Sequence, residues 1–414
     1  MSKRRVVISG LGCVTSLGEN VNEMFDAVCE GTSGISTIEA FDTSEYPVKF
    51  GGEVKSFNPS KYFPGREAKR MDRFTQMALA SAMQAVDDSG LDFEKEDKSR
   101  VGVIVGTGIG GLETIEEQHV RLLKKGPKKV SPFCVPKLMS NAASGCISMR
   151  YGLRGPNFCI VTACASASNS ILEAYYNVLA DRSDICITGG SEAALTPIGL
   201  ASFCSLKSLS TRNSDPQSAS RPFDKDRDGF VLSEGAGIMV IEEYEHARKR
   251  GANIYCELLG GAATGDGHHI TAPLPDGAGA AAAMRIALKH ACIRSDKMDY
   301  INAHGTSTSL NDAAESSAIK SVFGDYAYNI AVSSTKSSLG HMLGASGGVE
   351  LIISAKVIKE SVIPPTANLT EVDKKCDPKM DYVPGLARKC RVDVAMSNSL
   401  GFGGHNCCLI LGKI

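Results

Sequence analysis

The amino-acid sequence predicts an α/β fold. Short runs of β-branched or apolar residues recur along the 414 residues, and segments with apolar residues at helical spacing lie between them. The composition, with 43% hydrophobic and 22% charged residues, is typical of a globular protein. Strands that alternate with helices favour α/β layers over a sandwich or a helix bundle.

Six strands are predicted, most of them closed by a glycine. They cover residues 6–10, 101–106, 185–190, 238–241, 255–261 and 300–304. Longer helices are predicted between them, over residues 68–89, 112–125, 168–179, 278–291 and 312–323.

Two halves with a similar order of strands and helices meet near residue 251, after a short helix predicted over 244–249. We therefore expect an N-terminal domain at 1–251 and a C-terminal domain at 252–414. No strict sequence repeat exists, so only the order of the elements indicates an internal duplication. Residues 205–230 are rich in Ser, Asp, Arg and Pro and are expected to form a long functional or interfacial loop.

Composition argues against several classes of protein. The net charge of −1 gives no global attraction to nucleic acid. The fourteen cysteines contain no Cys-x-x-Cys pair, so we expect reduced thiols rather than disulfides or a zinc site. The apolar run 6–10 is too short for a signal-peptide core, and no run approaches the roughly 18 residues of a membrane helix. A soluble, cytoplasmic protein is expected.

Cys164 is the candidate nucleophile. It ends the strand-like run 157–164, immediately before the helical pattern that starts at residue 168. A helix N-terminus favours an anion, so we expect a stabilised thiolate with a lowered pKa. The alternative is a buried, inert cysteine.

Two histidines and a lysine complete the candidate site. His304 follows an apolar strand and precedes a small polar loop, whereas His341 lies between Lys336 and a run of Gly, Ala and Ser. Each histidine alone could be structural, but both occur at strand ends, where sites of α/β proteins form. A thiol, two histidines and a lysine are the inventory of a thiolate-based acyl-transfer enzyme.

Four motifs carry a family resemblance. They are Thr162-Ala163-Cys164-Ala165, Asn302-Ala303-His304-Gly305-Thr306, Lys336-Ser337-Ser338-Leu339-Gly340-His341 and Gly401-Phe402-Gly403-Gly404. In this order they resemble the β-ketoacyl-acyl-carrier-protein synthases, most closely the elongating enzymes of type II fatty-acid synthesis. The resemblance implies a thiolase-like fold of two similar halves, with stacked mixed sheets between layers of helices, and a homodimer. It also implies decarboxylative condensation of acyl- and malonyl-loaded acyl carrier protein.

The resemblance assigns a role to each motif residue. Cys164 would carry the acyl group, and His304 and His341 would donate hydrogen bonds to the malonyl thioester as it becomes an enolate. The backbone N–H groups of Cys164 and Phe402 would bind the oxyanion, and Phe402 would also gate the site. Lys336 would be an electrostatic member of the site. No cofactor is needed, because loss of carbon dioxide drives the reaction.

Further residues are expected around this centre. Lys336 is predicted to pair with Glu315, with Asp312 one helical turn earlier; the alternative for both acids is a solvated helix face. Thr306 and Thr308 match positions that bind the phosphopantetheine arm. Ile109 matches a position lining the acyl pocket, although a plain core role fits as well.

Two groups of ligand positions also follow from the resemblance. A carrier protein is acidic, so a basic docking surface is expected, against the alternative of ordinary solvated charge. Its residues would be Arg66, Lys69, Arg70, Lys128, Lys129 and Lys207. A monovalent cation of structural role would be held by Asn302, Ala303, Glu350, Ser397 and Asn398.

One glycine-rich motif suggests a cofactor, and one residue departs from the family pattern. Residues 106–111 fit a dinucleotide-binding pattern, but the acid expected to bind the ribose is missing, so we reject that cofactor. His405 stands where bacterial members usually have threonine, and leaves fine substrate preference open.

Several rival functions remain. A polyketide-type ketosynthase would use the same residues on other acyl groups. A non-catalytic partner subunit that shapes chain length characteristically lacks the nucleophile, which argues against it here. A degradative thiolase fits the two histidines and the lysine less well. A cysteine hydrolase would release free acid. The preferred chain length and saturation of the acyl group are not predicted.

Overall fold

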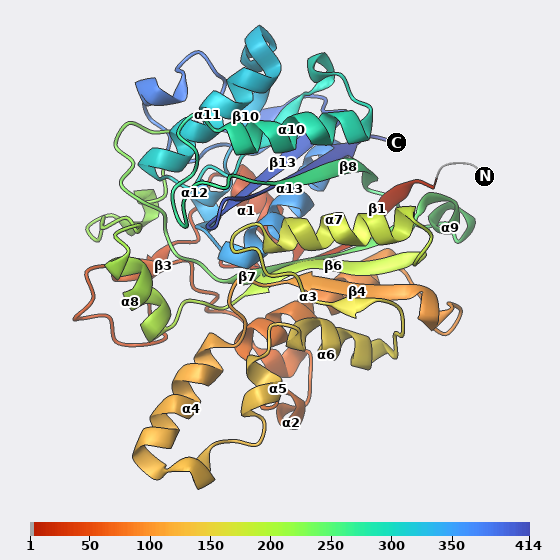
Figure 1. Cartoon of the computed structure of the whole chain (residues 1–414), viewed down its shortest axis with the longest axis vertical. Helices are drawn as coiled ribbons and strands as arrows, with labels where there is room; N and C mark the ends of the chain where they lie inside the picture. The colour runs from red at the N-terminus through yellow and green to blue at the C-terminus, as the bar shows by residue number, and fades with distance from the viewer. Residues whose placement is uncertain (1–3) are drawn as a thin grey trace.

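A computed structural model describes residues 4–414 (Figure 1), so residues 1–3 of the basic start lie outside it. Its centre is a mixed ten-stranded sheet of order β10-β9-β13-β14-β8-β1-β7-β6-β4-β5. The strands are β1 Val6–Val14, β4 Val101–Gly106, β5 Asn157–Phe158, β6 Ile185–Glu192, β7 Gly235–Glu243, β8 Cys256–Gly265, β9 Tyr300–Asn302, β10 Ala331–Ser333, β13 Val394–Gly401 and β14 His405–Gly412. Two small ladders pair β2 Ser36–Thr37 with β3 Phe50–Gly51, and β11 Val362–Ile363 with β12 Arg388–Lys389.

The expected duplication is confirmed by the pairing directions. In the first half β5, β4 and β6 pair in parallel, and β7 and β1 then continue antiparallel. In the second half β10, β9 and β13 pair in parallel, and β14 and β8 then continue antiparallel. The halves join where β1 pairs with β8, from Val6 opposite Leu258 to Ile8 opposite Cys256.

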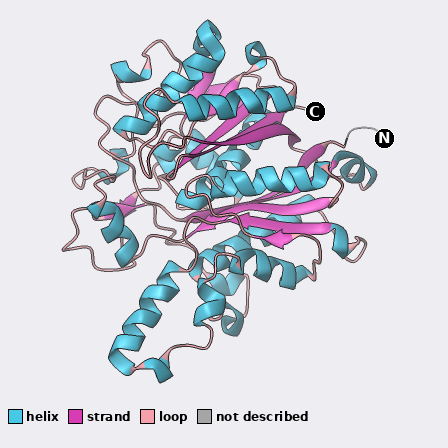
Figure 2. Ribbon diagram, in the orientation of Figure 1, coloured by secondary structure: helices cyan, strands magenta, loops and turns pink. Residues whose placement is uncertain are grey.

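Helices flank the sheet on both faces (Figure 2). They are α1 Val21–Cys29, α2 Gly65–Ala68, α3 Arg73–Ser89, α4 Leu112–Lys125, α5 Cys134–Leu138, α6 Ala142–Tyr151, α7 Ser166–Leu179, α8 Pro197–Ser205, α9 Tyr244–Lys249, α10 Ala278–Ala291, α11 Ser309–Phe323, α12 Lys336–Leu339 and α13 Ser346–Glu360. Helix α13 packs on α7 and on strands of both halves, and all its residues from 346 to 358 are buried, as a central helix requires. Outside this centre, α3 covers β1 and β7, and α10 covers β8 and β14.

The element predictions hold with two corrections. The helix expected over 68–89 is broken into α2 and α3, because Asp72 accepts a hydrogen bond from the Phe74 N–H and caps a new helix. The strand expected over 300–304 ends at Asn302, so His304 lies beyond it. Residues 206–230 form the expected loop, which starts one residue later than predicted because α8 ends at Ser205, and a 3₁₀ turn at Pro216–Ser218 interrupts it.

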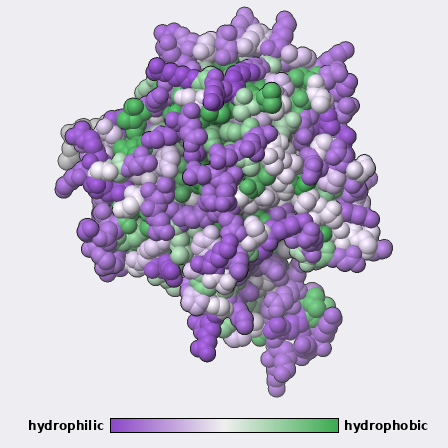
Figure 3. Space-filling model, turned by 180° about the vertical axis from the view of Figure 1, so that it is seen from behind, coloured by the Kyte–Doolittle hydropathy of each residue, from purple (hydrophilic) through white to green (hydrophobic). Residues whose placement is uncertain are grey.

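The surface is polar over most of the face seen in Figure 3, with apolar residues in scattered groups. Helix α4 projects from the body (Figure 1) and exposes apolar side chains, of which Leu123 is 72% exposed. Among residues 4–414, no helix is both long and apolar enough to cross a bilayer.

Candidate active site

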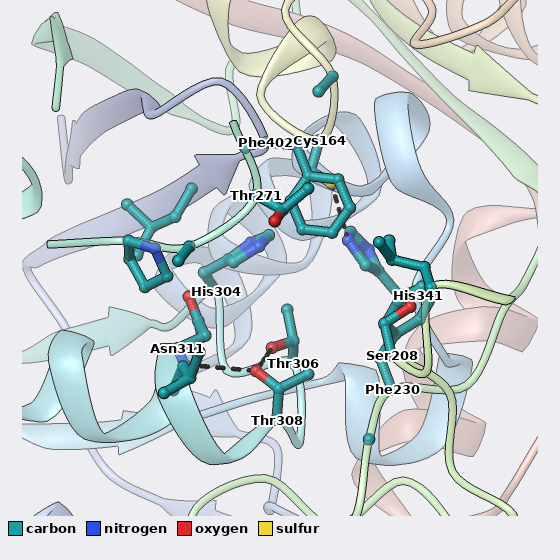
Figure 4. A pocket seen from close by; sticks show the side chains of 18 of the residues that line it. Cys164, Ser208, Phe230, Thr271, His304, Thr306, Thr308, Asn311, His341 and Phe402 are labelled. Atoms are coloured by element: carbon teal, nitrogen blue, oxygen red, sulfur yellow. Dashed lines mark hydrogen bonds between the residues drawn. The ribbon is translucent and has the colours of Figure 1, made fainter. Parts of the chain in front are cut away.

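A cavity of about 490 Å³ brings the motifs of both halves together (Figure 4). Cys164 and Ile109 come from the first half, and His304, His341 and Phe402 from the second. The histidines follow β9 and β10, and residue 109 follows β4, so the cavity lies at the carboxyl ends of parallel strands. The sulfur of Cys164 and a ring nitrogen of each histidine lie within 4.8 Å of one another.

Cys164 is held in a tight turn just before α7. Ala163 has φ of 49°, and the Ser166 hydroxyl donates to its carbonyl oxygen while accepting from the Thr162 N–H. A β-carbon on Gly401 would lie 2.8 Å from the Thr162 carbonyl oxygen, so glycine lets the Phe402 loop approach the Cys164 turn this closely.

The lowered pKa expected for Cys164 is wrong. Burial raises the pKa of this thiol to about 12, although Lys336 and the Phe402 N–H act in the opposite direction. Cys164 does lie just before helix α7, but its side chain is only 7% exposed, and desolvation of the thiolate is the larger effect. The resting side chain is therefore a neutral thiol, which would need a proton acceptor to become a nucleophile.

His341 is the side chain next to that thiol. Its Nε2 lies 3.1 Å from the Cys164 sulfur, and its Nδ1 lies 3.0 Å from the Ser346 hydroxyl. A hydroxyl can donate or accept, so either tautomer of the ring is satisfied. Burial and the Lys336 charge hold the pKa of His341 well below its usual range, which keeps the ring neutral.

His304 is restricted to one tautomer. The Lys336 ammonium lies 3.3 Å from its Nδ1 and also donates to its carbonyl oxygen at 2.6 Å. An ammonium has donors only, so Nδ1 accepts and Nε2 carries the proton. Burial, with the charge of Lys336, lowers the pKa of His304 well below its usual range, and the ring is a neutral donor.

The pairing predicted between Lys336 and Glu315 is wrong. Lys336 pairs with the buried carboxylate of Glu350, one helix further along the chain. Glu315 instead accepts from the backbone N–H groups of His304 and Gly305, at 2.8 Å each, and burial raises its pKa to about 7.

Asp312 and Glu315 lie behind the cavity wall and do not line it. Asp312 accepts from the Thr306 N–H at 3.0 Å, and Arg227 lies 3.6 Å from it while donating to the Thr308 carbonyl. Both acids are fully buried, so the solvated-face alternative is excluded. They fix the loop after β9 instead of touching a ligand.

Thr306, Thr308 and Ile109 line the cavity at the positions the sequence indicates. The two threonine hydroxyls lie 2.9 Å apart, across the cavity from Phe402 (Figure 4). Several further lining residues were not predicted, among them Ser208, Phe230, Thr271 and Asn311. Ser208 and Phe230 lie in the long loop expected over residues 205–230, whereas no sequence signal marks Thr271 or Asn311. His405 is exposed at the start of β14 and does not line the cavity.

The predicted basic residues are all exposed. Arg66 lies in α2 and Lys69 and Arg70 directly follow it, and the Arg70 guanidinium lies 5.2 Å from the centre of the Phe133 ring before α5. Lys128 and Lys129 follow α4, and Lys207 reaches the rim of the cavity.

The oxygens expected around a cation are buried and close to the site. Among residues 4–414, no hydrogen-bond partner is found for Asn302 Oδ1, Glu350 Oε2, Ser397 Oγ or Asn398 Oδ1. Buried oxygens without partners are unfavourable unless a ligand satisfies them. The donor set, with the adjacent Ala303, fits a hard cation that binds oxygen.

Comparisons with known proteins identify the family of the chain. The family descriptions "Beta-ketoacyl synthase, N-terminal domain" and "C-terminal domain" match residues 3–247 and 255–370. The 3-oxoacyl-[acyl-carrier-protein] synthase 2 of Synechocystis sp. is 49% identical over 413 residues, covering 100% of this chain and 99% of that protein.

Solved structures show the same fold. A β-ketoacyl synthase from Burkholderia phymatum is 35% identical with a TM-score of 0.92, over 99% of this chain and 100% of that one. A type II polyketide ketosynthase, solved in complex with its acyl-carrier protein, is 33% identical with a TM-score of 0.93 over all of both chains. The chain therefore belongs to the β-ketoacyl synthase family.

Proposed function

We propose that this chain condenses an acyl-carrier-protein thioester with malonyl-carrier protein, giving the 3-oxoacyl thioester, carbon dioxide and free carrier. One observation carries the proposal: a buried cysteine lies 3.1 Å from one neutral histidine, beside a second histidine fixed as a hydrogen-bond donor. Such a set suits acyl transfer followed by stabilisation of an enolate.

Loading comes first. His341 Nε2 accepts the Cys164 proton as the sulfur attacks the acyl thioester carbonyl, while the Nδ1 proton is held by Ser346. The tetrahedral oxyanion meets backbone N–H groups of Cys164 and Phe402. Its collapse breaks the carrier C–S bond, the carrier thiolate takes the proton, and an acyl-cysteine remains.

Condensation follows on the same cysteine. Malonyl thioester loses carbon dioxide, and the electron pair moves into an enolate whose oxygen receives hydrogen bonds from His304 and His341. The enolate carbon attacks the acyl-cysteine carbonyl, and expulsion of the Cys164 thiolate completes the new carbon–carbon bond. Thr306 and Thr308 would hold the pantetheine arm in the cavity.

The test is a mass-spectrometric condensation assay with acyl-carrier proteins of graded chain length and malonyl-carrier protein. A 3-oxoacyl product two carbons longer than the primer is expected. Loading of Cys164 without any longer product would instead indicate an acyltransferase or hydrolase. Activity confined to polyketide-type acyl groups would favour the polyketide ketosynthase, which shares the fold at a TM-score of 0.93.

We further propose a homodimer and an acidic carrier-protein partner. The edge strand β5 is exposed, and Phe158 and Val161 are 37% and 52% exposed, which is an apolar edge suited to a second copy. Lys207 lines the cavity and the basic residues around α2 are exposed, so both are accessible to an acidic carrier. Sedimentation of wild type and Val161→Arg tests the dimer, and an unchanged dimer in the variant would contradict this edge.

We also propose that Asn302, Ala303, Glu350, Ser397 and Asn398 hold a monovalent cation of structural role. When bound, it would neutralise buried oxygens next to β9 and α13. The domain boundary after residue 251 and the cytoplasmic location stay predictions.

A further inference from the structure

We propose that Glu192 is a positioning residue that sets the depth of the acyl cavity, by fixing the Ile109 loop against the loop that follows His341. This inference rests on the proposed function, because it assigns chain-length preference to that same cavity. Glu192 does not itself line the cavity and acts through residues that do.

The carboxylate of Glu192 is fully buried at the end of β6. On the Ile109 loop, it accepts from the Thr107 hydroxyl at 2.9 Å, the Gly108 N–H at 2.6 Å and the Ile109 N–H at 3.2 Å. Its fourth donor is the Gly344 N–H at 3.1 Å. A carboxylate accepts through both oxygens, and here each oxygen serves two donors.

Two glycines show how closely the loops approach the carboxylate. A β-carbon on either Gly108 or Gly344 would lie 2.7 Å from Glu192 Oε2, and one on Gly344 would lie 2.2 Å from the Gly108 nitrogen. The two loops therefore meet on the carboxylate, and one comes from each half of the chain.

The neighbours of these glycines form the cavity wall. Ile109 and Leu343 both line the cavity, and Leu343 has φ of 46°, a strained conformation for a branched residue. The hydrogen bonds of Glu192 reach the residue next to Leu343 and Ile109 itself. The position of the carboxylate thus fixes the side chains of Ile109 and Leu343, and Leu343 follows His341 by two residues.

Packing alone does not explain a carboxylate here. Desolvation raises the pKa of Glu192, and a buried acid is unfavourable unless its hydrogen bonds are needed. An amide of the same shape would offer one oxygen and one NH₂ group. With the NH₂ group toward Thr107, that hydroxyl could still accept, but the Ile109 N–H would lose its acceptor.

The test is Glu192→Gln, compared with Glu242→Gln as a matched control. Glu242 is also fully buried, accepts from Ser9, His246 and Arg250, and pairs with Ile185 at the opposite end of β6. Loading of Cys164 is measured by mass spectrometry against acyl-chain length, together with the melting temperature and malonyl decarboxylation.

Glu192→Gln is expected to change the ratio of long- to short-chain loading by about threefold to tenfold, the effect of one weakened buried hydrogen bond. Glu242→Gln should lower the melting temperature and leave that ratio unchanged. Should Glu192→Gln not fold, Thr107→Val removes one donor to Glu192 and is expected to shift the ratio in the same direction by less.

Two results would overturn the inference. One is a uniform loss of loading at every chain length in the Glu192 or Thr107 variant, which is the mark of a merely structural role. The other is an unchanged ratio while the wild type condenses normally. A wild type that loads no acyl chain would instead overturn the proposed function together with this inference.

Discussion

The two histidines of the site are chemically identical but differently fixed. His304 lies between Lys336, which donates to its Nδ1, and a loop held by the carboxylates of Asp312 and Glu315. Within residues 4–414, the ring nitrogens of His341 meet only groups that can reverse their hydrogen bond, the Ser346 hydroxyl and the Cys164 thiol. Because Lys336 can only donate, His304 keeps its proton on Nε2 and is suited to stabilise negative charge. The partners of His341 can reverse their hydrogen bonds, which lets His341 both accept a proton and donate one.

The largest effect is expected when the Cys164 thiol, the partner of His341, is removed. Cys164→Ala should abolish acyl loading but retain malonyl decarboxylation, because both histidine donors remain. Mass spectrometry of the intact protein after incubation with acyl-carrier protein measures loading, and carbon dioxide release measures decarboxylation. Normal loading of the variant would contradict the assignment of the nucleophile.

The next test separates the two histidines. Removing one donor to a developing oxyanion lowers the rate about 10²–10³-fold, so His304→Ala and His341→Ala should each lose condensation to that extent. Only His341→Ala should also slow loading, because only His341 contacts the sulfur. Single-turnover loading of both variants checks this, and equal slowing would mean that the roles are not divided.

The pKa of Cys164 gives a test of intermediate size. With the pKa raised to about 12, the thiolate fraction rises about tenfold for each pH unit between pH 7 and 10. The rate of alkylation of Cys164 by iodoacetamide should follow this rise without a plateau. Mass spectrometry against pH measures it, with the exposed Cys292 as an internal reference. A plateau below pH 9 would show a stabilised thiolate.

The smallest effect is expected from removing the hydroxyl that contacts His341 Nδ1, a partner that His304 does not have. Ser346→Ala removes the partner of His341 Nδ1, the loss of about one hydrogen bond, and should slow loading and condensation severalfold. Decarboxylation by Cys164→Ala compared with Cys164→Ala/Ser346→Ala isolates the donor role of His341. If loading and condensation by Ser346→Ala kept wild-type rates, the exchange of tautomers at His341 would not be needed.

Local pattern was sufficient for the elements and for the motif residues. Helices α4, α9 and α10 and strand β4 begin and end at the predicted residues, because their periodicity and glycines are local signals. The thiol and both histidines converge because strand ends meet at one edge of a sheet.

Partners chosen by three-dimensional packing could not be predicted. The lysine pairs with Glu350 rather than Glu315, and Cys164 is desolvated by loops from far along the chain. Glu192 was not predicted, because the strand expected over 185–190 ends before it, whereas β6 runs to Glu192 and buries the carboxylate.

The β1–β7–β8 junction has a consequence for synthesis of the chain. Strand β1 is translated early, yet its partners start at residues 235 and 256. At roughly 5–20 residues per second, on the order of ten seconds to a minute passes before the ribosome delivers them. During that interval the buried residues of β1 have no partner strand, so β1 can enter the sheet only once β7 and β8 have been synthesised.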